Sequence, residues 1–173
     1  TCHSLVEPLA QGGKALQGDP MEVALVEMAR PFMMAQAPAR RVGEWPFDSD
    51  RMRQSVQVAT DAGCTLFCKG APETVLPLCA QIFAGGQARP LDAAARAAIL
   101  AAQERMAAQG LRVLAFAFRV TAVCGGVPLP EQELVFCGLV GLEDPPRPEV
   151  PEAVRQCREA GIRVIMVTGD HPH

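Results

Sequence analysis

The sequence predicts an α+β fold, in which an antiparallel twisted sheet of about six strands is flanked by helices and is followed by a partial α/β strand-helix-strand unit. Before residue 143, short segments of alternating polar and apolar residues are joined by turns such as residues 61–63, which is typical of antiparallel hairpins. After a proline-dense joint at residues 144–148, a helix and a short apolar segment follow in the order typical of parallel sheets. We therefore expect two units, residues 1–143 and residues 144–173.

The first half of the chain is expected to open with a helix and continue with hairpin strands. Asp19 can cap a helix that begins at Pro20 and runs to about Met34, since proline suits the first helical position. Strands are expected over residues 42–47, 54–59 and 64–69. A short helix then starts at residues 70–73, and Pro77 kinks or ends it.

The second half is expected to hold one long helix and two further strands before the joint. Asp92 can cap an alanine-rich helix over residues 93–109, and Gly110 can end it. A turn is expected at Gly85-Gly86. Strands are expected over residues 111–120 and 134–142. In the second unit we expect a helix over residues 151–160 and a buried strand over residues 163–167.

The composition indicates a globular chain. Its 173 residues suffice for one domain and part of another, and the apolar content of 49% excludes a disordered tail. The net charge is −3 and no run of five like charges occurs, so we expect no nucleic-acid partner. No apolar run approaches the ~20 residues that span a bilayer. Because the chain starts at Thr1 without a signal peptide and stops soon after a predicted strand, we expect a segment of a longer protein.

The seven cysteines indicate thiols in a reducing compartment. Their number is odd and no CxxC motif occurs, which disfavours both a secreted disulfide framework and a zinc ribbon. The three histidines lie near the two ends of the chain, and none has a ligand partner at helical spacing. We therefore expect buried or free thiols and no metal ligands.

Lys69 and Gly70 form the most specific short motif. A lysine at the end of a strand, followed by a glycine and a helix start, places an ammonium beside helix amides, which suits an anion. The alternative is a surface lysine in front of a helix. Thr168, Gly169 and Asp170 follow a predicted strand, where a hydroxyl, an amide and a carboxylate suit a phosphate and its Mg²⁺. The alternative there is an ordinary turn.

Three further residues are candidates for contacts with a ligand. Phe47 lies beside a charged loop and can stack on a purine, or it can belong to the core. Glu22 lies early in the first helix, where it binds a ligand or only serves the helix dipole. Arg112 lies on an apolar strand face and needs a carboxylate or a phosphate as its partner.

Taken together, six phrases in this order resemble the P-type cation-transporting ATPases. The nucleotide-binding domain of that family shows phrases like those at residues 18–25 (GDPMEVAL), 46–51 (PFDSDR), 69–73 (KGAPE) and 110–115 (GLRVLA). The phosphorylation domain that resumes after it shows phrases like those at residues 144–148 (DPPRP) and 168–172 (TGDHP). The phrases span nearly the whole chain. They look more like the calcium, magnesium, sodium or proton pumps than the heavy-metal branch.

The resemblance implies a role for each matched residue. Phe47 would stack on adenine, and Glu22 would approach its amino edge. Lys69 would line the pocket near the α-phosphate, and Arg112, with Leu114 beside it, would close over the nucleotide and touch phosphate.

The complete set of site residues implied in this way has two parts. The nucleotide-binding residues are Glu22, Phe47, Arg51, Lys69, Gly70, Arg112 and Leu114. The incomplete catalytic site near the terminal phosphate and Mg²⁺ consists of Asp144, Thr168, Gly169 and Asp170.

Two departures from the family pattern limit what the chain is expected to do. Met52 stands where the family usually has a lysine, and Arg51 or Arg53 is expected to compensate. The phosphorylated motif Asp-Lys-Thr-Gly-Thr and the later motif Gly-Asp-Gly-x-Asn-Asp do not occur. We therefore expect the chain to bind ATP or ADP without turnover.

The implied parent is a membrane enzyme that couples ATP hydrolysis to cation transport. The implied partners are its actuator, phosphorylation and transmembrane domains, the cofactors are ATP and Mg²⁺, and this chain would be a cytoplasmic domain of it. Two alternatives are a soluble regulatory or scaffolding module without nucleotide binding and a fragment of a haloacid-dehalogenase-like phosphatase. The phosphatase would need a nucleophilic aspartate after a first strand, and no such strand precedes Thr1.

Overall fold

The computed structural model describes residues 19–32, 40–60, 63–122, 124, 129–143 and 147–167. Within this part of the chain, seven strands and several helices follow one another. Their bounds, in chain order, are α1 Pro20–Ala29, η1 Arg30–Phe32, β1 Arg40–Asp48, β2 Arg53–Thr60, β3 Gly63–Gly70, α2 Pro72–Val75, η2 Leu76–Leu78, β4 Cys79–Ala84, β5 Gln87–Pro90, α3 Ala93–Ala107, β6 Arg112–Thr121, β7 Leu134–Leu142 and α4 Val150–Glu159.

The predicted α+β class is confirmed, with a mostly antiparallel sheet. The strands of the described part form one seven-stranded sheet in the order β1-β2-β3-β6-β7-β4-β5. Neighbouring strands are antiparallel except for β4 and β7, which run parallel. The expectation of about six strands falls short because β4 and β5, which flank the turn at Gly85-Gly86, were not predicted. The exposed β5 offers no apolar alternation that would reveal a strand.

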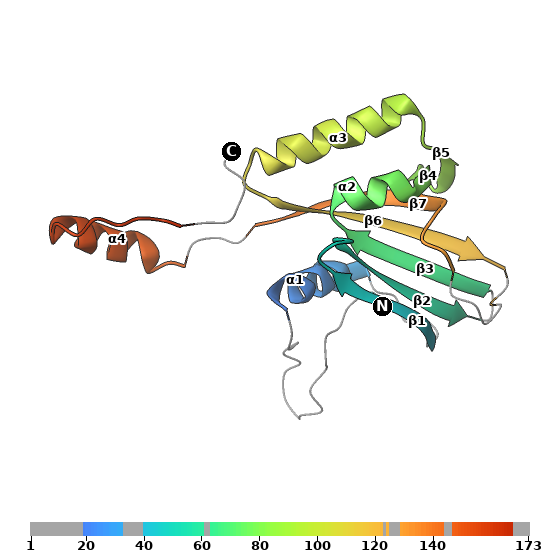
Figure 1. Cartoon of the computed structure of the whole chain (residues 1–173), viewed down its shortest axis with the longest axis horizontal. Helices are drawn as coiled ribbons and strands as arrows, with labels where there is room; N and C mark the ends of the chain where they lie inside the picture. Colours follow the sequence, from blue (N-terminus) through green and yellow to red (C-terminus); the bar gives the residue numbers. More distant parts are fainter. Residues whose placement is uncertain are drawn as a thin grey trace.

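Helices lie on both faces of the sheet (Figure 1). α2 and α3 pack against β3, β6 and β7 on one side, and α1 lies on the other. Because strand side chains alternate, Leu66 and Cys68 of β3 point into the core under α2 and α3, while Lys69 points toward α1. The core between sheet and helices consists of Leu66, Cys68, Val75, Leu76, Cys79, Ile99, Ala115, Ala117, Leu134 and Phe136.

The predicted capping signals are confirmed. The Asp19 side chain accepts hydrogen bonds from the amides of Met21, at 2.9 Å, and Glu22, at 3.3 Å, which fixes the start of α1. Asp92 accepts from the Ala95 amide at 2.7 Å and fixes the start of α3. Gly110 follows that helix with a φ of +77°, which glycine adopts without strain.

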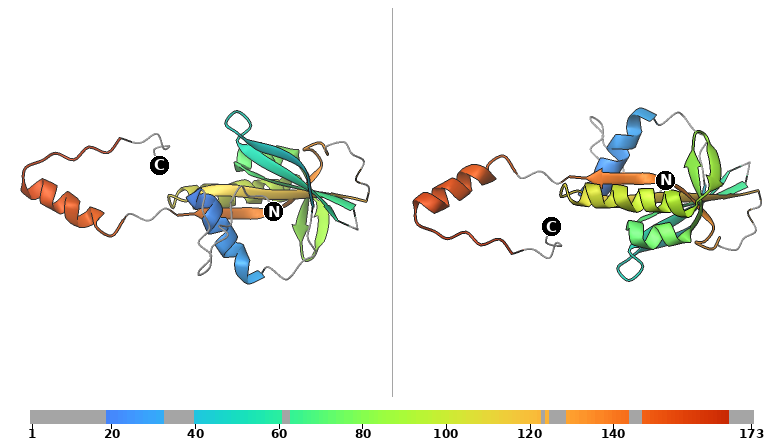
Figure 2. Two further views of the ribbon diagram at one scale, coloured as in Figure 1. Left: turned by 90° about the horizontal axis from the view of Figure 1, so that it is seen from below. Right: turned by 90° about the horizontal axis from the view of Figure 1, so that it is seen from above.

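The segment after the joint differs from its prediction. α4 forms and lies apart from the sheet, together with the residues that follow it (Figure 2). Residues 163–167 were expected to be a buried strand, but the structure assigns no strand to them and their side chains are exposed. A strand needs a neighbour for its backbone hydrogen bonds, and no described segment lies beside this one as a strand.

The expectation of free thiols is wrong for two cysteines. Cys64 and Cys124 form a disulfide with a Cα–Cα distance of 5.2 Å, which suits such a bond. Cys64 pairs with Thr121 in the β3–β6 ladder, so a residue shortly after Thr121 comes within reach of it. The remaining described cysteines, Cys68, Cys79, Cys137 and Cys157, are free thiols.

Candidate functional site

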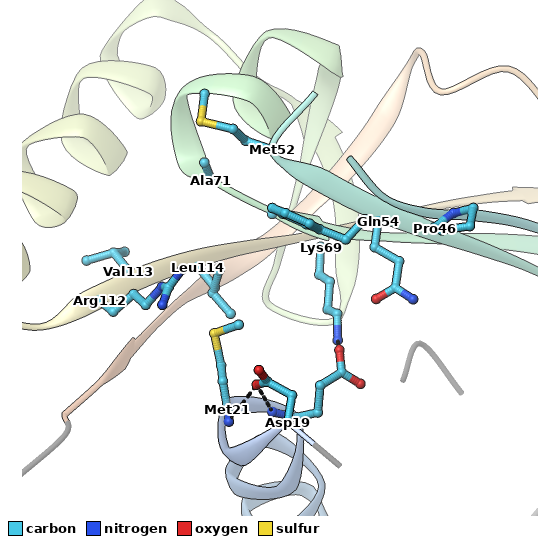
Figure 3. A pocket seen from close by; sticks show the side chains of 13 residues that line it. Asp19, Met21, Pro46, Met52, Gln54, Lys69, Ala71, Arg112, Val113 and Leu114 are labelled. Carbon is cyan, nitrogen blue, oxygen red and sulfur yellow. Dashed lines mark hydrogen bonds and ion pairs between the residues drawn. The ribbon is translucent and has the colours of Figure 1, made fainter. Parts of the chain in front are cut away.

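A pocket of about 560 Å³ opens on the face of the sheet that carries α1. Four stretches that lie far apart in the sequence meet around it, namely the start of α1, the β1–β2 connection, the end of β3 and the start of β6. Figure 3 shows Arg112 and Leu114 on one side of the pocket, Pro46 and Gln54 on the other, and Lys69 between them. Its lining residues are Asp19, Met21, Glu22, Pro46, Phe47, Met52, Gln54, Lys69, Gly70, Ala71, Arg112, Val113 and Leu114.

A tight turn between β1 and β2 carries one wall of the pocket. The Asp48 carboxylate accepts hydrogen bonds from the amides of Asp50, at 2.9 Å, and Arg51, at 3.0 Å, and these bonds lower the pKa of Asp48. The Met52 amide donates to the Asp48 carbonyl at 2.7 Å, and Met52 takes a φ of +48°. Phe47 lies at the edge of this turn and is 64% exposed, so most of its surface is available to a ligand.

A buried ion pair lies at the base of the pocket. Lys69, at the end of β3, is only 7% exposed, and its Nζ atom forms a salt bridge and a hydrogen bond with Oε1 of Glu22 from the first turn of α1. Gln54 is directly opposite Lys69 in the β2–β3 register and is also buried. The lysine therefore belongs to the pocket and does not lie loose on the surface in front of a helix.

Gly70 allows two walls of the pocket to approach each other closely. A Cβ atom at this position would lie 2.4 Å from the Met52 carbonyl oxygen and 2.5 Å from the Arg53 Cβ atom. The next residue, Ala71, donates its amide to that same Met52 oxygen at 2.9 Å. The glycine after Lys69 is thus needed to seat the end of β3 against the β1–β2 turn.

Arg112 supplies positive charge at the mouth of the pocket. It is exposed, and within the described part of the chain its guanidinium forms no hydrogen bond or ion pair with another residue. Leu114, two residues along β6, lies on the same strand face. An anionic ligand would therefore meet the Arg112 guanidinium without first breaking an ion pair.

Comparison with known proteins places these residues in a family. A family model described as P-type ATPase, cytoplasmic domain N, matches residues 2–149. The chain belongs to this family. The sequence resemblance to P-type ATPases is thereby confirmed, and the α+β fold with its mostly antiparallel sheet is consistent with an N domain.

Several curated relatives of this N domain are named as cation-transporting ATPases. It is 39% identical to "Calcium-transporting ATPase 1" of Bacillus cereus over 159 residues, which cover 89% of this chain and 18% of the relative. It is 38% identical to "Calcium-transporting ATPase" of Bacillus subtilis, covering 92% of this chain and 19% of the relative. It is 36% identical to human "Sodium/potassium-transporting ATPase subunit alpha-4", covering 95% and 17%. The chain therefore spans less than a fifth of the length of these relatives.

The N domain brings together most of the residues predicted to bind nucleotide. Those that line the pocket are Glu22, Phe47, Lys69, Gly70, Arg112 and Leu114. Arg51 does not line it, because its guanidinium pairs with Glu131 at 2.6 Å, and Arg53 pairs with the same carboxylate at 3.0 Å. Neither arginine therefore lines the pocket beside Met52.

The predicted phosphate-side residues are not among the described residues. Asp144, Thr168, Gly169 and Asp170 are outside the described residues. In the described part of this N domain, no group of three His, Cys, Asp or Glu side chains is placed to hold a metal ion. No helix in that part is both long and apolar enough to cross a bilayer.

Sequence reasoning missed some of the residues that matter here. Met21, Pro46, Gln54 and Val113 line the pocket, and neither their type nor their spacing distinguishes them from ordinary helix or strand residues. Glu131 was also missed, because it lies 80 residues from Arg51 and carries no local motif. The pairing of β3 with β6 brings the end of β3 beside the start of β6, and sequence alone does not give that long-range pairing.

Proposed function

We propose that this N domain binds the adenosine part of ATP in its pocket and serves as the nucleotide-binding part of a P-type ATPase that couples ATP hydrolysis to cation transport. The observation that supports this most strongly is the convergence of Phe47, Lys69, Glu22 and Arg112 from four distant stretches on one pocket. An exposed aromatic ring suits the purine base of a nucleotide, and two cations beside it suit the phosphates.

The size and the walls of the pocket suit a nucleotide. Its volume of about 560 Å³ is within the range usual for small-molecule sites. Pro46, Val113 and Leu114 contribute apolar surface that excludes water from a bound base. Polar groups are few and are positioned by the fold, which favours one orientation of the ligand.

Five of the pocket residues have specific roles in this proposal. Phe47 stacks on the adenine ring, and the Glu22 carboxylate accepts a hydrogen bond from the exocyclic amino group. Lys69, held by Glu22, directs its charge toward the α-phosphate. Arg112, with Leu114 beside it, closes over the nucleotide and meets phosphate oxygens. Binding here positions the nucleotide, which is the main demand that phosphoryl transfer makes on a protein.

We assign the reacting end of the nucleotide to the following domain. Bound ATP supplies the γ-phosphate for transfer to an aspartate of the parent enzyme. Asp144, Thr168, Gly169 and Asp170 belong to that side of the site, together with Mg²⁺. Since the described residues offer no metal-binding group, we derive no step through Mg²⁺ in this N domain.

We place the boundary between the two domains at Glu143. The nucleotide-binding domain then comprises residues 1–143, and residues 144–173 begin the phosphorylation domain. Two observations support this boundary: the sheet ends at Leu142, and α4 has no buried residue. The proposed partners are the actuator, phosphorylation and transmembrane domains of the parent, and the proposed location is the cytoplasmic side of a membrane.

Calorimetric or NMR titration of the chain with ATP, ADP and AMP tests the proposal. We expect weak and nearly equal affinities, on the order of 1 mM or about −4 kcal/mol, because adenine and ribose make most of the contacts. No binding at any accessible concentration would favour a scaffolding module instead. We also expect no ATP hydrolysis. Phosphate release that scales with protein, survives repurification and disappears in Lys69→Ala would contradict an inactive N domain.

A further inference from the structure

Glu131 connects a distant loop to the wall of the pocket without lining the pocket itself. It lies between β6 and β7, and its side chain is only 12% exposed. Its Oε1 atom accepts from Arg51 Nη2 at 2.6 Å and from Ser55 Oγ at 2.6 Å. Its Oε2 atom accepts from Arg53 Nε at 3.2 Å and from Arg53 Nη2 at 3.0 Å. One carboxylate thus gathers two arginines and a serine from the turn and the first part of β2.

The turn that Glu131 holds needs support from outside. Met52 has a φ of +48°, a left-handed conformation that residues other than glycine adopt only when their surroundings impose it. Arg53 Nη1 also donates to the Arg51 carbonyl at 3.4 Å, so the arginine held by Glu131 in turn holds the backbone of the turn. Phe47, which precedes this turn, and Met52, its last residue, both line the pocket.

The charges around the turn strengthen the same argument. Arg53 is 18% exposed and Arg51 is 30% exposed, so neither cation is fully solvated, and both form ion pairs with Glu131. Removing the charge of Glu131 would leave two like charges on neighbouring stretches of one hairpin. The hairpin would then relieve their repulsion by moving, because its tip is exposed.

We propose that Glu131 is a positioning residue for nucleotide binding. It acts through Arg51 and Arg53 to fix the turn of residues 48–52, and through that turn it holds Phe47 and Met52 at the pocket wall. The inference rests on the proposed function for its effect on affinity, while the effect on the turn is independent of any ligand. It also gives Arg51 a task other than the nucleotide contact predicted for it.

The test compares Glu131→Gln with Glu133→Gln in the full chain. Gln keeps the size of Glu131 and removes its charge. Glu133 is on the same loop, is 73% exposed and pairs only loosely with Arg119 at 3.8 Å, so it is a matched control. The first readout is amide hydrogen exchange at Met52, whose amide donates within the turn, and at Ala71, whose amide donates to the turn from the end of β3. The second readout is the affinity for adenosine and for ATP, measured at a temperature where all variants are folded.

We expect Glu131→Gln to speed exchange at Met52 and Ala71 while Ala117, in the core of β6, keeps its rate. Affinity for adenosine and for ATP should fall by the same factor of about tenfold, the size of a typical network coupling. Glu133→Gln should change neither readout. If Glu131→Gln does not fold, Ser55→Ala removes one of the four hydrogen bonds to Glu131 and should show the same pattern at smaller amplitude.

Three results would overturn the inference. Unchanged exchange at Met52 and Ala71 would mean that Glu131 does not hold the turn. Faster exchange with unchanged affinity would mean that the turn does not position the wall. Tighter ATP binding with unchanged adenosine binding would mean that Glu131 only withholds the arginines from phosphate. If the unsubstituted chain binds neither ligand, the proposed function fails, and the predicted effect on affinity fails with it. The exchange rates at Met52 and Ala71 are measured without ligand, so they still show separately whether Glu131 holds the turn.

Discussion

Replacing Phe47 by alanine is expected to weaken nucleotide binding and leave the fold nearly unchanged. Phe47 is 64% exposed, so the protein covers only about a third of it. Full burial of such a side chain contributes about 1.5–3 kcal/mol, so the covered third contributes roughly 0.5–1 kcal/mol to the free energy of unfolding. Stacking on a base contributes roughly 1–3 kcal/mol. The dissociation constant should therefore rise by about five- to 150-fold.

The assay is an NMR titration with ATP, paired with thermal unfolding of the same samples. Phe32→Ala is the matched control, since Phe32 is 82% exposed and does not line the pocket. The control should bind ATP as the unsubstituted chain does. If Phe47→Ala binds ATP as tightly as the control, the stacking role is wrong. If it unfolds at the temperature of the titration, Phe47 belongs to the core after all.

Three further substitutions test the remaining walls of the pocket. Met52→Lys should tighten ATP binding more than adenosine binding, by roughly 0.2–1 kcal/mol. This gain should shrink as the salt concentration rises, because an exposed charge contact is screened. Equal gains for both ligands, measured by calorimetry, would show that position 52 does not face the phosphates. Lys69→Ala should weaken AMP and ATP binding by roughly 1.5–3 kcal/mol, the range for a hydrogen bond to a charged group. If this variant is already unfolded before the titration, the pair of Lys69 and Glu22 is structural instead. Gly70→Ala should lower the free energy of unfolding in urea by about 1–3 kcal/mol, because its Cβ would lie 2.4 Å from the Met52 oxygen. Gly43→Ala is its control, with its nearest neighbours at 3.4 Å, and equal urea midpoints for the two variants would refute the close-approach argument.

Local signals in the sequence predicted the elements that local physics determines. The caps at Asp19 and Asp92 and the stop at Gly110 act within one helical turn, so the residues beside them suffice to place a helix end. β7 was predicted with its observed bounds, Leu134–Leu142, because it is a nearly unbroken apolar run. The resemblance to P-type ATPases also rested on short phrases, each of which is readable without knowledge of the fold.

What the sequence did not predict depends on pairing between distant segments. β4 joins the sheet through its parallel partner β7, and nothing within residues 79–84 indicates that neighbour. The bond between Cys64 and Cys124 spans 60 residues, and seven cysteines allow many pairings. The same limit applies to Arg51, whose partner Glu131 comes from the connection between β6 and β7.

The strand expected over residues 163–167 illustrates the opposite case. The apolar run of Val164, Ile165, Met166 and Val167 carries a strong strand signal, yet these side chains are exposed and unpaired in the described part of the chain. A pattern of residues predicts which face a strand can bury. It does not supply the neighbouring strands against which that face is buried.

The measurement that tests the central claim most directly is a two-dimensional amide NMR titration of this chain with ATP. Binding in the proposed pocket predicts that chemical shifts move at Phe47, Met52, residues 69–71 and residues 112–114, on the face of the sheet that carries α1. Adenosine should move most of the same resonances, with those near Arg112 responding mainly to the phosphates. Shifts confined to the α2 and α3 face, or no shifts at about ten times the expected dissociation constant, would contradict the account.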